Sequence, residues 1–306
     1  MRVLVTGGAG FIGSHLVQKL LREPTVTVRI LDNLHRCCNS FAGVPRVEFL
    51  RGDIRDRQAV HAATDGIDVI YHLAAQSTVL GAVKDIDYSF TTNVAGTLEV
   101  LSAACDCGVR KVIFTSSREV YGQTASLPVP ESAPFSPKNA YGTSKAAGEL
   151  YCRFFAESGI DVEVLRLANV YGPGDSERVI PLFLANALNG LPLVIHGENK
   201  ILDFVWIGDV VDALVSVQTL ALSGQPLNIG SGEGTSLLDL AQQILRLTRS
   251  PSVIQSAGAR KAEVDRFVAD IRLAENLLDY RPSRAMAHLP EVAAVFTQKA
   301  SKWPPY

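Results

Sequence analysis

Tyr141 and Lys145 stand four residues apart in a segment with helical spacing of apolar residues, so both side chains would share one helix face. A lysine ammonium beside a phenol favours the phenolate and lowers its pKa from about 10. Such a tyrosine can take a proton from a hydroxyl group and return it. Ser117, after a strand-like run, could share that proton. Alternatively, these residues have no catalytic role: Tyr141 and Lys145 would lie on a solvated helix face, and Ser117 would only hydrogen-bond the local backbone.

A glycine-rich turn lies near the start of the chain, between a β-branched run and a helical pattern. Gly7, Gly10 and Gly13 have the spacing of a dinucleotide-binding turn, and Phe11 and Ile12 open the helix. Glycine suits places where the backbone adopts positive φ or approaches a pyrophosphate, and the N–H groups of the helix start then bind the anion. The alternative is a tight turn without a ligand.

A carboxylate, Asp32, follows the second strand-like run about 20 residues after the glycines, where it would accept ribose hydroxyls and repel a 2′-phosphate. The sequence therefore favours NAD over NADP, although His35 and Arg36 keep NADP open. Further candidate cofactor residues stand at later strand ends and helix starts: Asn33, Asp53, Ile54, Leu73, Ala74, Ala75, Asn93 and Ser116, together with Tyr141 and Lys145.

Short β-branched runs alternate with helical patterns over the first part of the chain, which predicts an α/β fold with a Rossmann-type, doubly wound parallel sheet. The expected strands are Arg2–Thr6, Val26–Leu31, Val47–Leu50, Val69–Leu73, Lys111–Ser116 and Val162–Ala168. The expected helices between them are Ser14–Arg22, Asp56–Thr64, Thr92–Cys107 and Tyr141–Ser158.

Glycine and proline become more frequent after Gly172, and helix and strand patterns then return over 179–189, 209–222, 226–229 and 236–249. We expect residues 1–169 to form the NAD-binding domain, with 205–229 returning to its sheet. Residues 170–204 and 230–306 would form a smaller C-terminal lobe that binds the substrate.

Composition indicates a small-molecule partner. With 20% charged residues and a net charge of −2, neither nucleic acid nor a membrane surface is indicated. No apolar run reaches the roughly 18 residues of a spanning helix and no signal peptide is visible, so a cytoplasmic location is expected. Free thiols and no metal site are expected, because the spacing of the cysteines and histidines fits no metal site: Cys37, Cys38, Cys105, Cys107, Cys152, His15, His35, His61, His72, His196 and His288.

Five ordered motifs together resemble the extended short-chain dehydrogenases, in particular the NAD-dependent nucleotide-sugar epimerase and dehydratase family typified by UDP-glucose 4-epimerase. The motifs are Thr6 to Gly13, Asp32 to Leu34, Ser116-Ser117 before Val120-Tyr121-Gly122, Tyr141 to Lys145, and Arg166 to Pro173.

The resemblance implies that NAD takes a hydride from C4 of a UDP-sugar while Tyr141 accepts the hydroxyl proton. An epimerase then returns the hydride to the other face of the rotated 4-keto sugar. Lys145 would lower the pKa of Tyr141 and hold the nicotinamide ribose, and Ser117 would bind the C4 oxygen. Helices 92–107 and 141–158 resemble those that pair in family dimers, so a homodimer is expected.

The substrate residues implied by the resemblance include one departure. Asn169 matches an asparagine that contacts the diphosphate, and Arg260 matches an arginine that binds the phosphates. Where the family has Arg-Asp-Tyr or Arg-Asp-Phe, this chain has Leu202-Asp203-Phe204, so phosphate binding would depend on Arg260 with Arg178 or Lys200. Phe267 matches the position that gates the C2 substituent, unless it is a core residue.

The second departure is Arg118 before Glu119, at a place where related dehydratases have Asp-Glu. In those enzymes the Asp protonates the leaving C6 hydroxyl and the Glu removes the C5 proton. Arginine does not give up its proton, so ordinary dehydration is disfavoured and a 4-epimerase is preferred. A dehydratase or decarboxylase that uses Glu119, an NAD(P)H-dependent keto-sugar reductase and a non-catalytic cofactor-binding protein remain alternatives. Arg118 could bind the C6 carboxylate of UDP-glucuronate or UDP-galacturonate. Alternatively, it could form an ion pair with Glu119 or with another residue at the protein surface.

Overall fold

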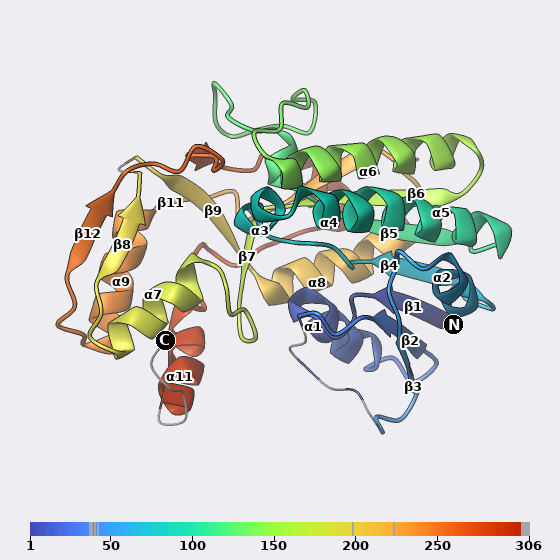
Figure 1. Ribbon diagram of the computed structural model, residues 1–306, viewed down its shortest axis with the longest axis horizontal. Helices are drawn as coiled ribbons and strands as arrows, with labels where there is room; N and C mark the ends of the chain where they lie inside the picture. The colour runs from blue at the N-terminus through green and yellow to red at the C-terminus, as the bar shows by residue number, and fades with distance from the viewer. Residues whose placement is uncertain (37–38, 40, 42, 198, 223, 301–306) are drawn as a thin grey trace.

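The structure, a computed structural model, describes residues 1–36, 39, 41, 43–197, 199–222 and 224–300 (Figure 1). Cys37 and Cys38 lie outside these residues, and Cys105, Cys107 and Cys152 are free thiols, as predicted. Within the described part of the chain, no helix is long and apolar enough to cross a membrane.

Seven parallel strands of the described residues form the main sheet, in the order β10-β6-β5-β4-β1-β2-β3. They are β1 Arg2–Thr6, β2 Thr27–Asp32, β3 Val47–Arg51, β4 Val69–His72, β5 Lys111–Ser117, β6 Asp161–Leu167 and β10 Pro226–Ile229. All the predicted strands form with small shifts at their ends. The predicted fold class is confirmed.

Helices cover both faces of this sheet (Figure 1). On one face lie α1 Phe11–Leu20 and α8 Ile207–Ser216, which contact each other; on the other lie α2 Arg57–Thr64, α5 Gly96–Asp106 and α6 Ala140–Glu157. Successive side chains of β1 point to opposite faces of the sheet. Val3 and Val5 pack with Leu16 of α1, whereas Leu4 packs with Val100 of α5. Such strands are buried on both sides, which explains their nearly continuous apolar sequences.

Four short elements connect β4 and β5 to the helices of the second face. They are α3 Val79–Lys84, α4 Ile86–Phe90, the π-helix η1 Thr91–Ala95 and the 3₁₀ helix η2 Arg118–Val120; a further 3₁₀ helix, η3 Val217–Thr219, follows α8. A π-helix is rare and commonly marks a functional site.

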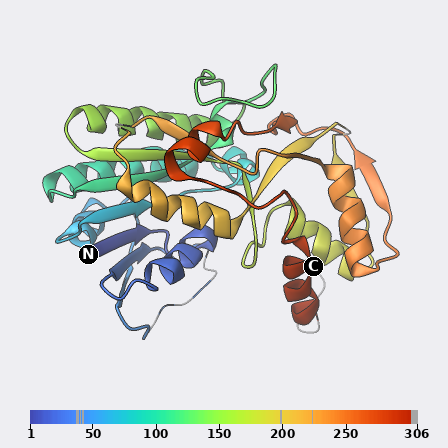
Figure 2. The same ribbon diagram turned by 180° about the vertical axis from the view of Figure 1, so that it is seen from behind.

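The smaller lobe has its own sheets and core (Figure 2). Its strands are β7 Asn169–Tyr171, β9 Ile201–Trp206, β11 Gly234–Ser236 and β13 Arg266–Phe267 in one sheet, and β8 Leu193–His196 with β12 Ile254–Ala257 in another. Its helices are α7 Val179–Leu188, α9 Leu237–Thr248 and α11 Leu289–Ala300. Residues 230–306 are not confined to this lobe, because α10 Arg272–Leu278 contacts β10 of the main sheet.

Candidate active site

The glycine turn after β1 leaves no room for larger residues. Gly7 has φ of +72°, and a Cβ there would lie 2.7 Å from the Ala74 backbone nitrogen. A Cβ on Gly13 would lie 2.2 Å from the carbonyl oxygen of Gly7. Gly10 precedes α1, and no side chain caps this helix. The turn therefore offers the open helix N-terminus and close backbone approach that a pyrophosphate requires.

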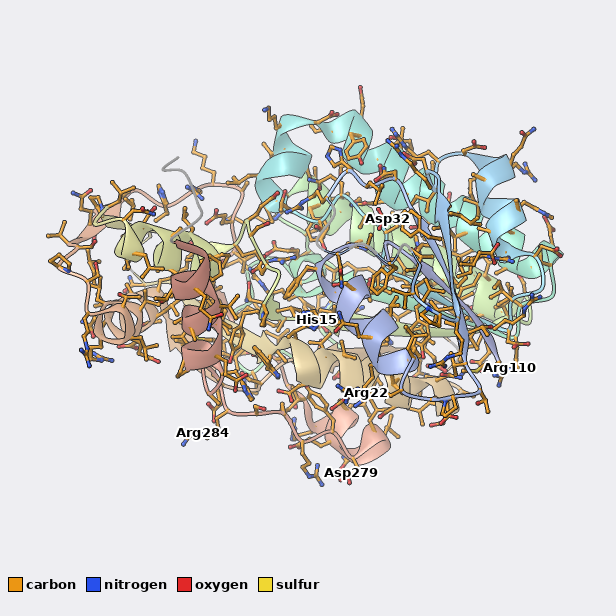
Figure 3. All side chains as sticks on the ribbon, turned by 90° about the horizontal axis from the view of Figure 1, so that it is seen from below. His15, Arg22, Asp32, Arg110, Asp279 and Arg284 are labelled. Carbon is orange, nitrogen blue, oxygen red and sulfur yellow. The ribbon has the colours of Figure 1, made fainter. Side chains whose placement is uncertain are left out.

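Asp32 is the last residue of β2 and lies beside this turn (Figure 3). Its carboxylate accepts hydrogen bonds from the backbone N–H groups of Ala9 at 3.0 Å and Leu34 at 2.8 Å. The side chain is buried, and burial raises the pKa of Asp32 in spite of these two bonds. The carboxylate thus lies beside the phosphate-binding turn, where a ribose would be bound.

Asn33 and Asp53 meet at the ends of neighbouring strands. Asn33 donates to Asp53 at 3.0 Å, and Arg55 binds both oxygens of Asp53 at 2.9 and 2.8 Å. The hydrogen bond from Arg55 is the main reason that the pKa of Asp53 falls to about 2. The side chain of Ile54 is instead buried beside Gly96, so it belongs to the core and could meet a cofactor only through its backbone.

Arg36, the residue that left NADP possible as the cofactor, already forms an ion pair within the protein. It forms an ion pair with Glu177 and donates to the Ser77 hydroxyl at 3.0 Å. A guanidinium held by a carboxylate is less available to a 2′-phosphate, which agrees with NAD as the cofactor.

A cleft of about 670 Å³ lies where the carboxyl ends of β4 and β5 face the smaller lobe. Its lining includes many of the predicted cofactor and substrate residues: Ile12, Leu73, Ala75, Ser116, Ser117, Arg118, Glu119, Tyr141, Lys145, Asn169, Arg178 and Arg260. The glycine turn, the Asp32 carboxylate and this cleft together provide the kinds of group that would hold a dinucleotide.

Ser117 and Tyr141 meet in the cleft. Ser117 is the last residue of β5 and Tyr141 lies in the first turn of α6, and the two side chains are close enough for Ser117 to lower the pKa of the phenol. Asn139 caps α6 by accepting the Gly142 N–H at 2.8 Å, which places Tyr141 at the helix start. Burial raises the pKa of the Tyr141 phenol, whereas the charge of Arg178 and the Ser117 side chain lower it.

Lys145, one turn after Tyr141 on α6, contacts β5. Its ammonium donates to the carbonyl of Thr115 at 2.8 Å and lies 4.8 Å from the centroid of the Phe114 ring. Burial lowers the pKa of Lys145 to about 8. Among the charges that lower the pKa of Tyr141, that of Arg178 has the largest effect.

Two predicted cofactor residues use their polar groups within the protein. Asn93, in the π-helix η1, donates to the Gln76 carbonyl and the Ser144 hydroxyl, both at 2.9 Å, and accepts the Gln76 N–H at 2.8 Å. The Ser116 hydroxyl donates to Glu149. Both side chains therefore position the cleft wall rather than offering free groups to a cofactor.

Arg118 and Glu119 form an ion pair inside the cleft, not at the surface. Arg118 Nη2 lies 2.8 Å from Glu119 Oε1, and the two side chains are 11% and 5% exposed. Glu119 Oε2 accepts a hydrogen bond from Asn139 at 2.8 Å. Arg118 Nη1 is buried and has no hydrogen-bond partner in the described structure.

Phe267 is a core residue rather than a gate. Its side chain is 1% exposed, and its ring stacks on Tyr121 with centroids 5.9 Å apart. It does not line the cleft, and its contact with the site is indirect, through the Arg118 guanidinium 5.7 Å from its ring centroid.

The far end of the cleft contains two linked cations. Lys200 and Arg260 both pair with Glu263, the arginine at 3.0 Å, and Lys200 lines the cleft close to Leu202, the residue that replaces the family arginine. Sequence reasoning missed Glu263, because it lies 63 positions from Lys200 in the chain and the two residues meet only in the folded protein.

Asn169 and Arg178 are held by neighbouring polar groups. Asn169 donates to the carbonyl of Asp203 at 2.9 Å. Arg178 pairs at 3.0 Å with Asp175, a buried residue that also lines the cleft and that sequence reasoning missed. No sequence motif marks Asp175.

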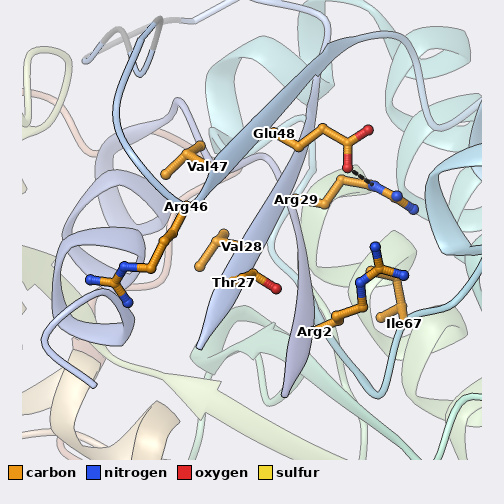
Figure 4. Close-up of a pocket in the computed structure, with 8 residues that line it drawn as sticks. All are labelled: Arg2, Thr27, Val28, Arg29, Arg46, Val47, Glu48 and Ile67. Carbon is orange, nitrogen blue, oxygen red and sulfur yellow. Dashed lines mark hydrogen bonds and ion pairs between the residues drawn. The ribbon is translucent and has the colours of Figure 1, made fainter. Parts of the chain in front are cut away.

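A second pocket, of about 290 Å³, lies at the amino ends of β1, β2 and β3, away from these motifs (Figure 4). Arg29 pairs there with Glu48 at 2.7 Å and donates to the carbonyls of Ala63 and Asp65. Arg46 donates to three backbone carbonyls. These arginines hold loop ends together, which is a structural role.

Comparisons with known proteins identify the family of the chain. The model of the NAD dependent epimerase/dehydratase family matches residues 3–230. The UDP-glucose 4-epimerase of Mycolicibacterium smegmatis is 35% identical over 302 residues, which cover 94% of this chain and 95% of that protein. The chain belongs to the NAD-dependent epimerase/dehydratase family, and its cofactor is NAD.

Solved structures of both activities resemble the chain. The dTDP-glucose 4,6-dehydratase DesIV of Streptomyces venezuelae, with NAD and TYD bound, has a TM-score of 0.93 and 34% identity, covering 100% of this chain and 99% of the other. The UDP-glucose 4-epimerase of Thermotoga maritima, with UDP-glucose, has a TM-score of 0.92 and 30% identity, covering 99% and 100%. The fold is therefore common to an isomerase and a lyase.

Proposed function

We propose that the chain is a UDP-sugar 4-epimerase that works through a 4-keto intermediate. The observation that carries this proposal is the buried pair of Arg118 and Glu119. Arginine occupies the place at which a dehydratase needs an acid, and it cannot protonate a leaving hydroxyl. Both oxygens of Glu119 are engaged, by Arg118 and by Asn139, so its carboxylate is held as part of the cleft wall.

Tyr141 is the general base of this proposal and Ser117 its partner. The Ser117 hydroxyl and the phenol line the same cleft and lie close to each other, so a C4 hydroxyl placed between them can bind both. Tyr141 takes the hydroxyl proton as the C4–H bond is oxidised and returns the proton when the ketone is reduced. NAD, when bound, supplies the reversible hydride acceptor. Arg178 favours the charged phenolate through its positive charge.

The diphosphate would be bound at the far end of the cleft. Lys200 lines the cleft near Leu202, so an ammonium group, paired with Glu263, lies close to the position of the missing family arginine. Arg260 lines the same region and shares Glu263 with Lys200. Asn169, at the start of β7, completes this group. These residues support a nucleotide diphosphate-linked substrate.

A homodimer is part of the proposal. Exposed apolar side chains gather on α3, α4 and α6, which contact one another: Leu80, Val83, Ile86, Phe90, Leu150 and Phe154. Contiguous exposed apolar surface commonly marks a protein interface, and the antiparallel or parallel pairing of two α6 helices would bury it.

The proposal is tested by incubating the purified protein with UDP-glucose, UDP-glucuronate and UDP-N-acetylglucosamine, with no added reductant, and identifying products by NMR and mass spectrometry. A 4-epimer of unchanged mass is expected, with no net formation of NADH. Loss of water or carbon dioxide would instead establish a lyase. A requirement for stoichiometric NAD(P)H would establish a reductase.

A further inference from the structure

Arg118 carries a buried charge that the protein satisfies only in part. Glu119 holds Nη2 at 2.8 Å, and the guanidinium lies 5.7 Å from the centroid of the Phe267 ring. Nη1 is buried without a hydrogen-bond partner among the described residues, although Arg118 lines the cleft. A buried charged N–H group without an acceptor is unfavourable, so Nη1 marks a place where a ligand acceptor would be stabilised.

The position of Arg118 defines which part of a sugar it would meet. It follows Ser117 directly in the chain, and its charge acts on the Tyr141 phenol. Ser117 and Tyr141 would hold the C4 hydroxyl, and the ring atoms next to C4 are C3 and C5. C3 carries a neutral hydroxyl in ordinary hexoses, whereas C5 carries C6, which is a hydroxymethyl group in hexoses and a carboxylate in uronic acids.

We infer that Arg118 binds the C6 carboxylate of a nucleotide-linked hexuronic acid, so that UDP-glucuronate and UDP-galacturonate are the preferred epimer pair. This inference rests on the proposed 4-epimerase function. A charge-assisted bond from a guanidinium to a carboxylate is stronger than one to a hydroxyl. Glu119 and Phe267 hold the guanidinium at one edge and one face, and neither provides an acceptor for Nη1.

The negative charge of Glu119 does not prevent this binding. Its two oxygens are directed to Arg118 and to the Asn139 amide, which disperse its charge. The cleft is also lined by Arg178, Lys200 and Arg260. Each of these three cations is paired with Asp175 or Glu263, whereas Arg118 Nη1 has no acceptor among the described residues, so the additional carboxylate of a uronic acid would be bound by Arg118.

The experiment compares UDP-glucuronate with UDP-glucose, which differ only at C6. The parent protein is expected to have the higher kcat/KM with UDP-glucuronate. Arg118→Gln should lower that kcat/KM by roughly 100-fold and lower the value for UDP-glucose much less, because both substrates lose the support that Arg118 gives to Glu119 but only UDP-glucuronate also loses the charged partner of its carboxylate. Arg118→Lys should recover part of the loss. Arg178→Gln, which also removes a cleft guanidinium, should affect both substrates alike.

The inference is overturned if the parent prefers UDP-glucose, or if Arg118→Gln lowers both values equally, since Arg118 would then only support Glu119. Dissociation constants of both sugars for the parent and for Arg118→Gln, measured by calorimetry, separate this inference from the epimerase proposal. If the product is a dehydrated sugar, the epimerase proposal fails, yet a selective loss of UDP-glucuronate affinity would uphold the Arg118 contact. If neither sugar nucleotide binds the parent, the inference fails.

Discussion

Arg166 binds both carboxylate oxygens of Glu149, with Nε 3.0 and 3.1 Å from Oε1 and Oε2 and Nη2 2.7 Å from Oε2. The two side chains are 3% and 4% exposed. Ser116 donates to the same carboxylate, and Arg166 also donates to the Tyr121 hydroxyl at 2.9 Å. This network joins α6, which carries Tyr141, to β5 and β6.

Glu149→Leu should strongly destabilise the protein, because it leaves the Arg166 charge buried and unpaired. The expected loss is about 3–5 kcal/mol in the free energy of unfolding. The double variant Glu149→Leu/Arg166→Met should recover most of that loss, since it removes both charges. Urea titration of the three proteins measures this. An equal loss in the single and double variants would contradict the role of the unpaired charge.

Gly13→Ala should abolish NAD retention. The added Cβ would lie 2.2 Å from the carbonyl of Gly7, so the turn must open and lose its close backbone approach. NAD released on denaturation can be quantified by chromatography. Gly258→Ala is the matched control, because nothing lies within 4 Å of its Cβ. Normal NAD content in Gly13→Ala would show that the turn does not bind the pyrophosphate.

Tyr141→Phe should lower kcat by about 10²–10⁴-fold, because the variant lacks a group to accept the hydroxyl proton. NAD content and thermal unfolding temperature should not change, since the Tyr141 side chain lines the cleft beside Ser117. Turnover close to that of the parent would exclude Tyr141 as the base.

Lys145 makes stability depend on pH. Burial lowers its pKa from 10.5 to about 8, so between these values the unfolded chain holds a proton that the folded protein has lost. The stability of the parent should therefore rise over pH 8–10.5 relative to Lys145→Met, by about 3 kcal/mol in total. Below pH 8 Lys145 is protonated in both the folded and the unfolded protein, and the buried charge then lowers the free energy of unfolding by its full amount.

Urea unfolding of the parent and Lys145→Met at pH 7, 9 and 10 measures this difference directly. Subtracting the two proteins removes the contribution of groups that titrate in both. A difference that does not change with pH would mean that Lys145 remains charged in the folded protein throughout this range.

Phe154→Glu should give a monomer at micromolar concentration. Phe154 is 62% exposed on α6, and a charge there would have to be buried in the proposed interface. Light scattering coupled to size exclusion measures the mass in solution. Leu238→Glu, at a residue 47% exposed on α9, should leave the mass unchanged. A monomeric parent would refute the homodimer.

Local sequence signals predicted the main sheet and the cofactor turn well. The strands of a parallel sheet have nearly continuous apolar sequences, and the turn requires Gly7 and Gly13 whatever surrounds it. Asp32 was predictable for the same reason, because its distance from the glycines is a property of one βαβ unit. Tyr141 and Lys145 were placed on one helix by their spacing alone.

Only the tertiary structure decided what those side chains contact. Lys145 donates to the carbonyl of Thr115, and Phe267 is in the core behind Arg118. Glu263 is joined to Lys200 across 63 positions of the chain. Such contacts depend on how separate elements pack and on how deeply each charge is buried, and neither is encoded in a short pattern. The residues Tyr141 and Lys145 were readable from the sequence, but their electrostatic environment was not.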